Sequence, residues 1–326
     1  MKLLIIRLSS FGDVVQCQAC LPAIKSAHPG AEIHWLTKKQ FTQVLEVNPN
    51  IFKVHSFDSK QGLIGWLKLC FKFKDQSFDV VYDAHSNIRT LLFKLIFRLC
   101  FTKTKIVTRS KERFKRILLF KFRLNKFPWP FKGMQSYIRP LQRIMDVPIE
   151  TQIQSWDFEK VDLEKIQKLI PYSHYVGLAP SAAWEMKRWP LDYWKELIYT
   201  SPTKKFVVLG GPDDTFCEEL VEIAPDRVVN LSGKLSLMES CYVAFKSSRF
   251  VSADTGLLHV ADLLGTKTIA LIGPTAFGFP SGEHVKTLEI DLNCRPCTKD
   301  GRGGCSQKVY KRCMVEIRSE FVKKLL

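Results

Sequence analysis

The sequence of 326 residues has no long hydrophobic run. A membrane-spanning helix needs ~18 apolar residues in succession, and the nearest stretch, 91–101, is interrupted by Lys94 and Arg98. The apolar run before Arg7 is also shorter than the apolar region of a signal peptide. We therefore expect a cytoplasmic protein, whose ten cysteines are thiols, metal ligands or core residues rather than disulfides.

Acidic residues are scarce. The chain has 32 Asp and Glu against 49 Lys and Arg, which gives a net charge of +17 and favours an acidic partner. In the basic segment, residues 94–132, thirteen Lys or Arg accompany a single acid, Glu112, and many aromatic residues. Either this segment meets phosphates and acyl chains, or it is a solvated surface whose aromatic side chains lie in the core. Because no nucleic-acid motif accompanies the charge, we expect no nucleic-acid partner.

Short apolar runs alternate with helical patterns, and no hairpin signal separates them. This order predicts an α/β fold with two Rossmann-like parallel-sheet domains that face a central cleft. A polar, irregular region at 147–172 separates them, so we expect domains at 1–155 and 156–326. The expected strands lie at 2–8, 32–37, 54–57 and 78–86 in the first domain, and at 175–181, 206–211, 227–233, 249–255 and 267–275 in the second.

The second half lacks both a Walker motif and a G-x-G-x-x-G fingerprint, which disfavours nicotinamide chemistry and ATP hydrolysis. Instead, an apolar strand runs directly into Asp254, Thr255 and Gly256, where a helix begins. The free N–H groups of a helix N-terminus bind anions, and His259 on the first turn could reach the same anion. The competing interpretation is that Asp254 or Thr255 only caps the helix.

Other loops of this kind carry further candidates. Small residues from Ser181 onward leave room for a ligand near the backbone, and Lys187 either neutralises a diphosphate or is an ordinary solvated charge. After the first strand, Gly12 precedes Asp13, which would suit a catalytic carboxylate or a helix cap. Polar side chains also follow the fourth expected strand, and they bind an anionic ligand or satisfy local backbone groups. They are Asp83, His85, Asn87 and Arg89.

Four cysteines near the C-terminus have the spacing C-x2-C-x7-C-x7-C: Cys294, Cys297, Cys305 and Cys313. Their number and the opening C-x2-C suit a structural zinc site, but the later intervals differ from those of a zinc ribbon. Two interpretations stay open, bound zinc and reduced or partly paired thiols. The remaining cysteines lie in apolar or helical contexts typical of a core.

Three stretches, at 7–37, 187–190 and 254–275, closely resemble glycosyltransferase family 9, the ADP-heptose:lipopolysaccharide heptosyltransferases. The resemblance implies a GT-B fold and an inverting, metal-independent transfer that needs no cofactor. It implies ADP-heptose as donor and an anionic lipopolysaccharide precursor, with its Kdo sugars and lipid A, as acceptor. It further implies an enzyme that associates peripherally with the cytoplasmic face of the inner membrane.

The resemblance also implies roles for the candidate residues. Asp13 would be the general base, beside Gly12 in the acceptor site. The donor site would comprise Ser181, Lys187, Asp213, Asp254, Thr255, Gly256 and His259. Two rival functions stay open: a transferase of the same fold with another nucleotide-sugar or acceptor, and a non-catalytic basic protein that binds RNA or acidic glycans.

Overall fold

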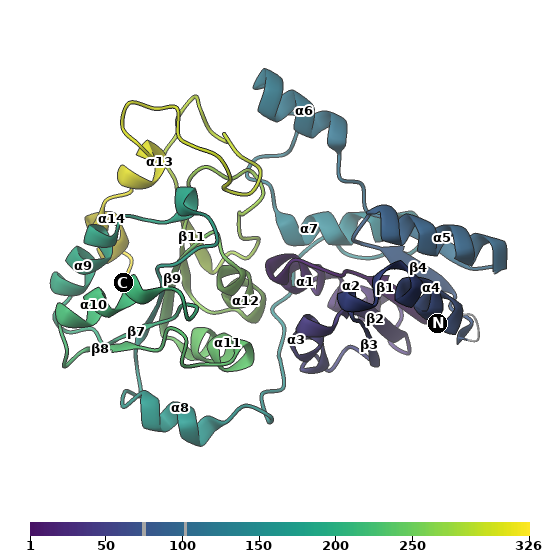
Figure 1. The fold of residues 1–326 in the computed structure, drawn as a ribbon, viewed down its shortest axis with the longest axis horizontal. Helices are drawn as coiled ribbons and strands as arrows, with labels where there is room; N and C mark the ends of the chain where they lie inside the picture. The colour runs from purple at the N-terminus through teal and green to yellow at the C-terminus, as the bar shows by residue number, and fades with distance from the viewer. Residues whose placement is uncertain (74–75, 101–102) are drawn as a thin grey trace. The chain divides into compact units, whose positions relative to one another are not determined.

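The computed structural model describes residues 1–73, 76–100 and 103–326, with Cys100 described only in its backbone. The chain divides into two compact units (Figure 1). Unit 1 comprises Met1–Arg113 and Met134–Asp157, and unit 2 comprises Phe114–Gly133 and Phe158–Leu326. Among the described residues, every helix is too short or too polar to cross a membrane.

Unit 1 is built on a five-stranded parallel sheet with the order β3-β2-β1-β4-β5. Its central strand is apolar and almost wholly buried, as a parallel strand covered on both faces must be. The strands are β1 (Lys2–Ile6), β2 (Glu32–Lys38), β3 (Lys53–Phe57), β4 (Val80–Asp83) and β5 (Lys105–Thr108). Ile6 of β1 pairs with Asp83 of β4, which brings the ends of these two strands together.

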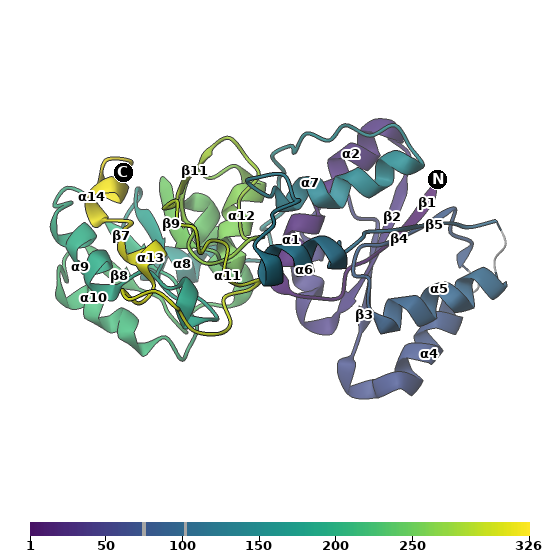
Figure 2. The same ribbon diagram turned by 90° about the horizontal axis from the view of Figure 1, so that it is seen from above.

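Helices cover both faces of this sheet. Figure 2 shows α2 and α7 on one side and α4 and α5 on the other. On the latter side, Trp66 and Phe93 join the apolar residues of β1, β2 and β4 in one core. The helices are α1 (Phe11–Cys17), α2 (Cys20–Ala27), α3 (Thr42–Glu46), α4 (Gly62–Lys72), α5 (Ile88–Cys100) and α7 (Gly133–Ile138), with 3-10 turns at Lys39–Phe41, Ser59–Gln61 and Arg139–Arg143.

Unit 2 is built on a six-stranded parallel sheet with the order β11-β10-β9-β6-β7-β8. Buried Trp194 and Leu220 pack against one face, and Leu258 packs against the other. The strands are β6 (Val176–Ala179), β7 (Phe206–Val208), β8 (Val228–Asn230), β9 (Arg249–Ala253), β10 (Thr268–Leu271) and β11 (Val285–Leu288).

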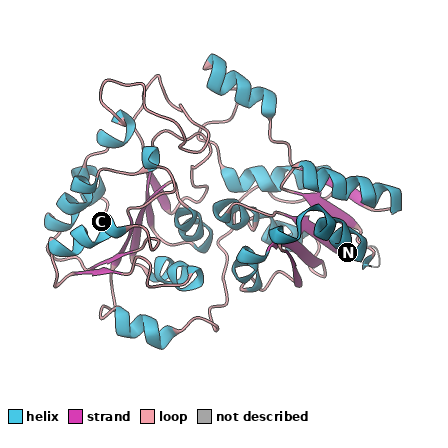
Figure 3. Cartoon of the chain, in the orientation of Figure 1, coloured by secondary structure: helices cyan, strands magenta, loops and turns pink. Residues whose placement is uncertain are grey.

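Helices α8 to α14 lie around the sheet of unit 2 and are among the helices drawn in cyan in Figure 3. Several begin at a polar cap. Ser236 and Glu239 exchange hydrogen bonds in a capping box that starts α11. The helices are α8 (Leu163–Leu169), α9 (Leu191–Tyr199), α10 (Glu218–Glu222), α11 (Leu237–Lys246), α12 (Gly256–Leu264), α13 (Arg312–Val315) and α14 (Ser319–Lys323), with 3-10 turns at Glu185–Lys187 and Thr215–Cys217.

Residues 114–133 depart from the domain division expected from the sequence. This segment, which holds most of α6 (Arg113–Phe122), belongs to unit 2, and the later boundary falls at 157. The ring of Phe277 makes edge contacts at 6.2, 5.3 and 4.9 Å between centroids, and that of Phe279 makes one at 4.8 Å. The partners are, in that order, Phe120, Phe127, Phe131 and Trp129.

Many aromatic residues of the basic segment therefore have an internal role. Phe97 is buried in unit 1 beside Phe93, which precedes the segment, while four others pack against the two phenylalanines of unit 2. The interpretation that places the aromatic residues of this segment in the core is confirmed for Phe97, whereas Phe120, Phe127 and Phe131 are partly buried and Trp129 is 42% exposed. Phe101 lies outside the described residues, and Phe114 and Phe122 are exposed.

Candidate active site

Asp13 lies on the first turn of α1, just beyond the end of β1. Ser10 precedes the helix, and its Oγ and N–H donate to Asp13 Oδ2 at 2.7 and 3.3 Å. Ser10 is thus the N-cap and Asp13 the third helical residue of a capping box, so Asp13 takes part in the cap without being the N-cap residue. Gly12 lies beside it on the same turn. Capping alone, however, does not account for the other groups around this carboxylate.

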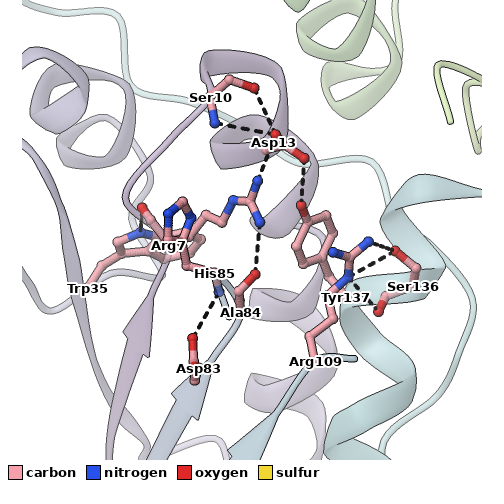
Figure 4. A network of polar contacts seen from close by, with 10 residues as sticks. All are labelled: Arg7, Ser10, Asp13, Trp35, Asp83, Ala84, His85, Arg109, Ser136 and Tyr137. Atoms are coloured by element: carbon pink, nitrogen blue, oxygen red, sulfur yellow. Dashed lines mark hydrogen bonds and ion pairs between the residues drawn. The ribbon is translucent and has the colours of Figure 1, made fainter. Parts of the chain in front are cut away.

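Two further donors hold Asp13 (Figure 4). Arg7 Nη2 lies 2.6 Å from Oδ2, and the hydroxyl of Tyr137 donates to Oδ1 at 2.9 Å. The guanidinium is largely buried, and its Nη1 donates to the backbone oxygen of Ala84 at 2.9 Å. The Asp13 side chain itself is 39% exposed. A carboxylate fixed by a buried cation yet open to solvent can meet a ligand in a defined orientation.

Arg109 supports the same cluster from β5's C-terminal side. Its guanidinium lies 4.1 Å from the centre of the Tyr137 ring, and Nη2 donates to Ser136 Oγ at 2.7 Å. Ser136 and Tyr137 are neighbours on α7 (Figure 4). The cation therefore fixes both the ring and the turn of helix that carries it, which orients the hydroxyl toward Asp13.

The charges around Asp13 decide its protonation. Burial alone would raise the pKa of this carboxyl, but Arg7, with the hydrogen bonds from Ser10 and Tyr137, holds the pKa well below its ordinary value. Burial raises the pKa of Tyr137, so its hydroxyl stays protonated and donates. Asp13 is therefore an ionised acceptor at neutral pH.

The polar turn after β4 is held mainly by its own side chains. Asp83 is fully buried, and its Oδ1 accepts from the N–H groups of Ser86 and His85 at 2.7 and 3.1 Å. Its Oδ2 lies 2.8 Å from Lys94 Nζ. Asn87 caps α5, since its Oδ1 accepts from Thr90 N at 3.0 Å. For Asp83 and Asn87 the structure shows the local role, and acceptor binding stays a prediction.

His85 and Arg89 differ from these two. Burial, and then the positive charge of Arg7, lower the pKa of His85 to about 4, so the ring is neutral at pH 7. Among the described residues, its buried Nδ1 has no hydrogen-bond partner. Figure 4 places His85 beside Arg7. Arg89 instead lies over the ring of Phe57, 6.0 Å from its centre. His85 is thus the member of the turn that borders the Asp13 cluster.

Unit 2 gathers three of its predicted residues around one carboxylate. Asp254 follows β9, with Lys187 Nζ 3.5 Å from Oδ2 and His259 Nε2 3.7 Å from Oδ1. Burial would raise the pKa of Asp254, but His259 and Lys187 hold it well below the ordinary value. A Cβ on Gly278 would lie 2.1 Å from the carboxyl carbon, so any other residue there would displace the Asp254 carboxylate.

The start of α12 adds donors to this cluster. Thr255 is the N-cap, and its hydroxyl accepts from Leu258 N at 3.3 Å, which confirms the capping interpretation for its side chain. Gly256 is the first helical residue. His259 is only 4% exposed, and in the part of the chain that the structure describes its Nδ1 is buried without a hydrogen-bond partner. A buried donor or acceptor of this kind is costly unless a ligand satisfies it.

In the loop after β7, Asp214 makes the contacts, although the residue predicted from the sequence is its neighbour Asp213. Ser181 Oγ donates to Asp214, which also accepts from Gly211 N at 2.7 Å. Asp213 is exposed. Asp214 is thus the acid that joins Ser181, and a role for Asp213 stays a prediction.

The comparisons with known proteins decide the family. Residues 66–310 match the sequence profile described as glycosyltransferase family 9 (heptosyltransferase). The chain belongs to this family. It is 23% identical over 315 residues to lipopolysaccharide heptosyltransferase 1 of Pseudomonas aeruginosa, covering 92% of this chain and 86% of that protein. The enzyme class predicted from the sequence, a glycosyltransferase, is therefore confirmed.

Solved structures show the same fold. A family 9 glycosyltransferase from Veillonella parvula superimposes with a TM-score of 0.76 at 19% identity, covering 99% of this chain and 95% of that one. The E. coli heptosyltransferase WaaC, solved with ADP, superimposes with a TM-score of 0.70 at 18% identity, covering 99% and 98%. Together with the two parallel sheets, these likenesses confirm the GT-B fold.

The C-terminal cysteines of this family 9 glycosyltransferase are free thiols. Burial is the main cause that raises the pKa of Cys313 to about 11, and the nearby sulfur atoms of the other three cysteines add to it, although Arg295 opposes the shift. Within the described ranges, no three His, Cys, Asp or Glu side chains are arranged to hold a metal ion. The residues thus share a neighbourhood without forming a ligand shell, and the zinc site stays a prediction.

The cysteines expected in the core behave as predicted where the structure describes them. They are buried, free thiols: Cys17, Cys20, Cys70, Cys217 and Cys241. The side chain of Cys100, also expected there, lies outside the described residues.

Proposed function

We propose that this family 9 glycosyltransferase moves a heptose from ADP-heptose to the inner core of a lipopolysaccharide precursor. The observation that carries the proposal is the Asp13 carboxylate, ionised by Arg7 and partly open to solvent. The donor cluster of unit 2 supports it. The name of the Pseudomonas relative and the ADP in the E. coli structure supply the choice of sugar and nucleotide.

The donor cluster suits a diphosphate. The N-terminus of α12 contributes backbone N–H groups and the positive end of the helix dipole. Lys187 lies 3.5 Å from Asp254, beyond ordinary hydrogen-bond length, so its ammonium can turn to a phosphate oxygen while it stays near the carboxylate. The unpartnered Nδ1 of His259 offers a further polar contact. Fixed donors of this kind stabilise the charge that develops on the leaving ADP.

The base is assigned to Asp13. The acceptor hydroxyl oxygen forms a bond to the anomeric carbon, the bond from that carbon to the diphosphate oxygen breaks, and ADP leaves with the electron pair. Asp13 takes the hydroxyl proton. Its low pKa makes it a weak base, so the proton transfers late, when bond formation has made the hydroxyl acidic. Among the described residues Oδ1 accepts only from Tyr137, which leaves a lone pair for this proton.

The positive charge of the chain supports an anionic acceptor. Kdo carboxylates and lipid A phosphates are anionic, and the chain carries a net charge of +17. An enzyme that acts on such a lipid-anchored acceptor would work in the cytoplasm, at the surface of the inner membrane. Neutral His85 beside Arg7 would line the acceptor side of Asp13.

A donor panel tests the proposal. Calorimetry with the purified protein should show binding of ADP-heptose but not of UDP-glucose or GDP-mannose, and Lys187→Ala should weaken it. Binding of a UDP- or GDP-sugar instead would move the donor assignment to the rival transferase. Salt-dependent RNA binding without affinity for any sugar nucleotide would favour the non-catalytic rival.

A further inference from the structure

Two neighbouring helices of unit 1 have an apolar outer face. On α5, Ile88, Leu91, Leu95 and Leu99 follow one another at helical spacing and are between 48 and 85% exposed. On α4, Leu63, Ile64 and Phe71 are between 56 and 70% exposed. The two helices contact each other and lie side by side in Figures 1 and 2. We call these seven side chains the α4–α5 face.

The α4–α5 face is distinct from the side of these helices that packs on the sheet. The inner side chains of the same helices are buried in the core of unit 1 and include Trp66, Cys70, Phe93 and Phe97. An ordinary surface helix is polar on the side opposite its core. Here both sides are apolar, and a contiguous exposed apolar surface indicates an interaction site.

The charges on these helices are of one sign. Neither 62–72 nor 88–100 contains an acidic residue. Lys68, Lys72 and Arg98 are exposed beside the apolar residues, whereas Lys94 is engaged by Asp83. On the described residues of these two helices, the exposed apolar side chains are accompanied by cations and by no acid, which matches the interface of an anionic bilayer, where acyl chains and phosphates lie in adjacent layers.

Charge also argues against a second copy of this chain as the occupant. A two-fold contact would place this face against itself, and the exposed cations of one copy would then oppose those of the other. Anionic lipid supplies the opposite charge. We propose that the α4–α5 face rests on the surface of an anionic membrane, with its aliphatic side chains between the headgroups. The proposal does not depend on which sugar the enzyme transfers.

The proposal moves the membrane contact away from most of the basic segment. Phe97 of that segment is buried, four further aromatic residues pack against Phe277 or Phe279, and only Leu95 and Leu99 of the segment belong to the α4–α5 face. Helix α6 is a competing surface, because Phe114, Ile117 and Phe122 are exposed on it among cations. It offers three exposed apolar side chains on one helix, whereas α4 and α5 offer seven on two helices that contact each other.

Vesicle co-sedimentation tests the proposal without any sugar substrate. The full chain should bind vesicles of phosphatidylglycerol and phosphatidylcholine and bind pure phosphatidylcholine weakly. The triple variant Leu91→Gln, Leu95→Gln, Leu99→Gln should weaken binding to the anionic vesicles about tenfold or more, because insertion scales with buried apolar area. Its melting temperature should stay near wild type, since these side chains are exposed.

Three control measurements distinguish the outcomes. Ile153→Gln removes an equally exposed apolar side chain elsewhere in unit 1 and should leave binding unchanged. Phe114→Gln with Ile117→Gln should reduce binding less than the triple variant does. Wild-type binding by the triple variant, or a larger loss from the α6 variant, would overturn the proposal. So would light scattering that showed a dimer abolished by the triple variant, together with no lipid binding by wild type.

Discussion

The substitution Asp13→Asn tests the base directly. Asparagine keeps the shape of the side chain and an oxygen that can accept from Tyr137, but it cannot take a proton. A positioned general base contributes about 10²- to 10⁴-fold, so kcat should fall by that factor, which corresponds to about 3 to 5 kcal/mol of transition-state stabilisation. The affinity for ADP-heptose, assigned to unit 2, should stay within about twofold.

The same substitution has a calculable effect on stability. Arg7 is largely buried while Asp13 is partly exposed, so the pair lies between a surface ion pair and a buried one. Losing it should cost about 1 to 3 kcal/mol of unfolding free energy. Because the pKa of Asp13 is lowered in the folded state, this stabilisation is present above the ordinary pKa of about 4 and is lost as the pH falls further. The melting temperatures of variant and wild type should therefore converge below about pH 4.

The assay follows product mass over time with saturating ADP-heptose, alongside thermal melts. Asp79→Asn is the matched control, since this carboxylate of unit 1 accepts only a backbone N–H from Lys2 in the described structure, at 2.7 Å. Its kcat should stay within about twofold of wild type. An Asp13→Asn variant that folds and retains wild-type kcat would refute the assignment of the base.

Other changes probe the surroundings of both clusters. Arg7→Gln removes the charge that lowers the pKa of the base, so the acidic limb of the kcat/KM profile should move to higher pH, and an unshifted limb would contradict the electrostatic account. Lys187→Ala should raise the Kd for ADP-heptose about tenfold, as calorimetry measures, and should lower the melting temperature because buried Asp254 loses a cation. Gly278→Ala should weaken donor binding, because its Cβ would overlap the Asp254 carboxylate. Gly304→Ala is the control, since a Cβ there has no atom within 4 Å and should leave donor affinity unchanged. Equal affinities of the two variants for ADP-heptose would contradict the overlap. If the C-terminal cysteines bind zinc, elemental analysis should find about one equivalent that Cys297→Ser removes, while none would favour free thiols.

The sequence predicts the strands of both sheets except for one edge strand in each. The predicted apolar runs correspond to β1 to β4 and to β6 to β10, because buried parallel strands are nearly continuous in apolar residues. The two strands that went unrecognised, β5 and β11, form edges of their sheets. Each is four residues long and half exposed, and Lys105 and Lys286 interrupt the apolar signal. An edge strand needs less apolar surface, so its pattern resembles that of a loop.

The candidate site was predictable where its residues are close in sequence. The caps of α1 and α12 each arise within one helical turn, and the sequence indicates Asp13 and Thr255 as capping candidates, although the N-cap of α1 is Ser10. The other residues that fix Asp13 are farther from it in the sequence. Tyr137 is 124 positions away, and only the tertiary fold brings it within hydrogen-bond distance. Arg109 was counted among the charges of the basic segment, yet it packs on Tyr137.

The most direct measurement of the central claim is product mass after the purified enzyme meets ADP-heptose and either Kdo2-lipid A or its heptosylated form. The account predicts a gain of one heptose on one of these acceptors and no gain when ADP-heptose is omitted. The acceptor that reacts would identify the step in core assembly. An unchanged mass on both acceptors, from a folded enzyme that binds ADP-heptose, would contradict the proposed acceptor, and failure to bind ADP-heptose would contradict the donor.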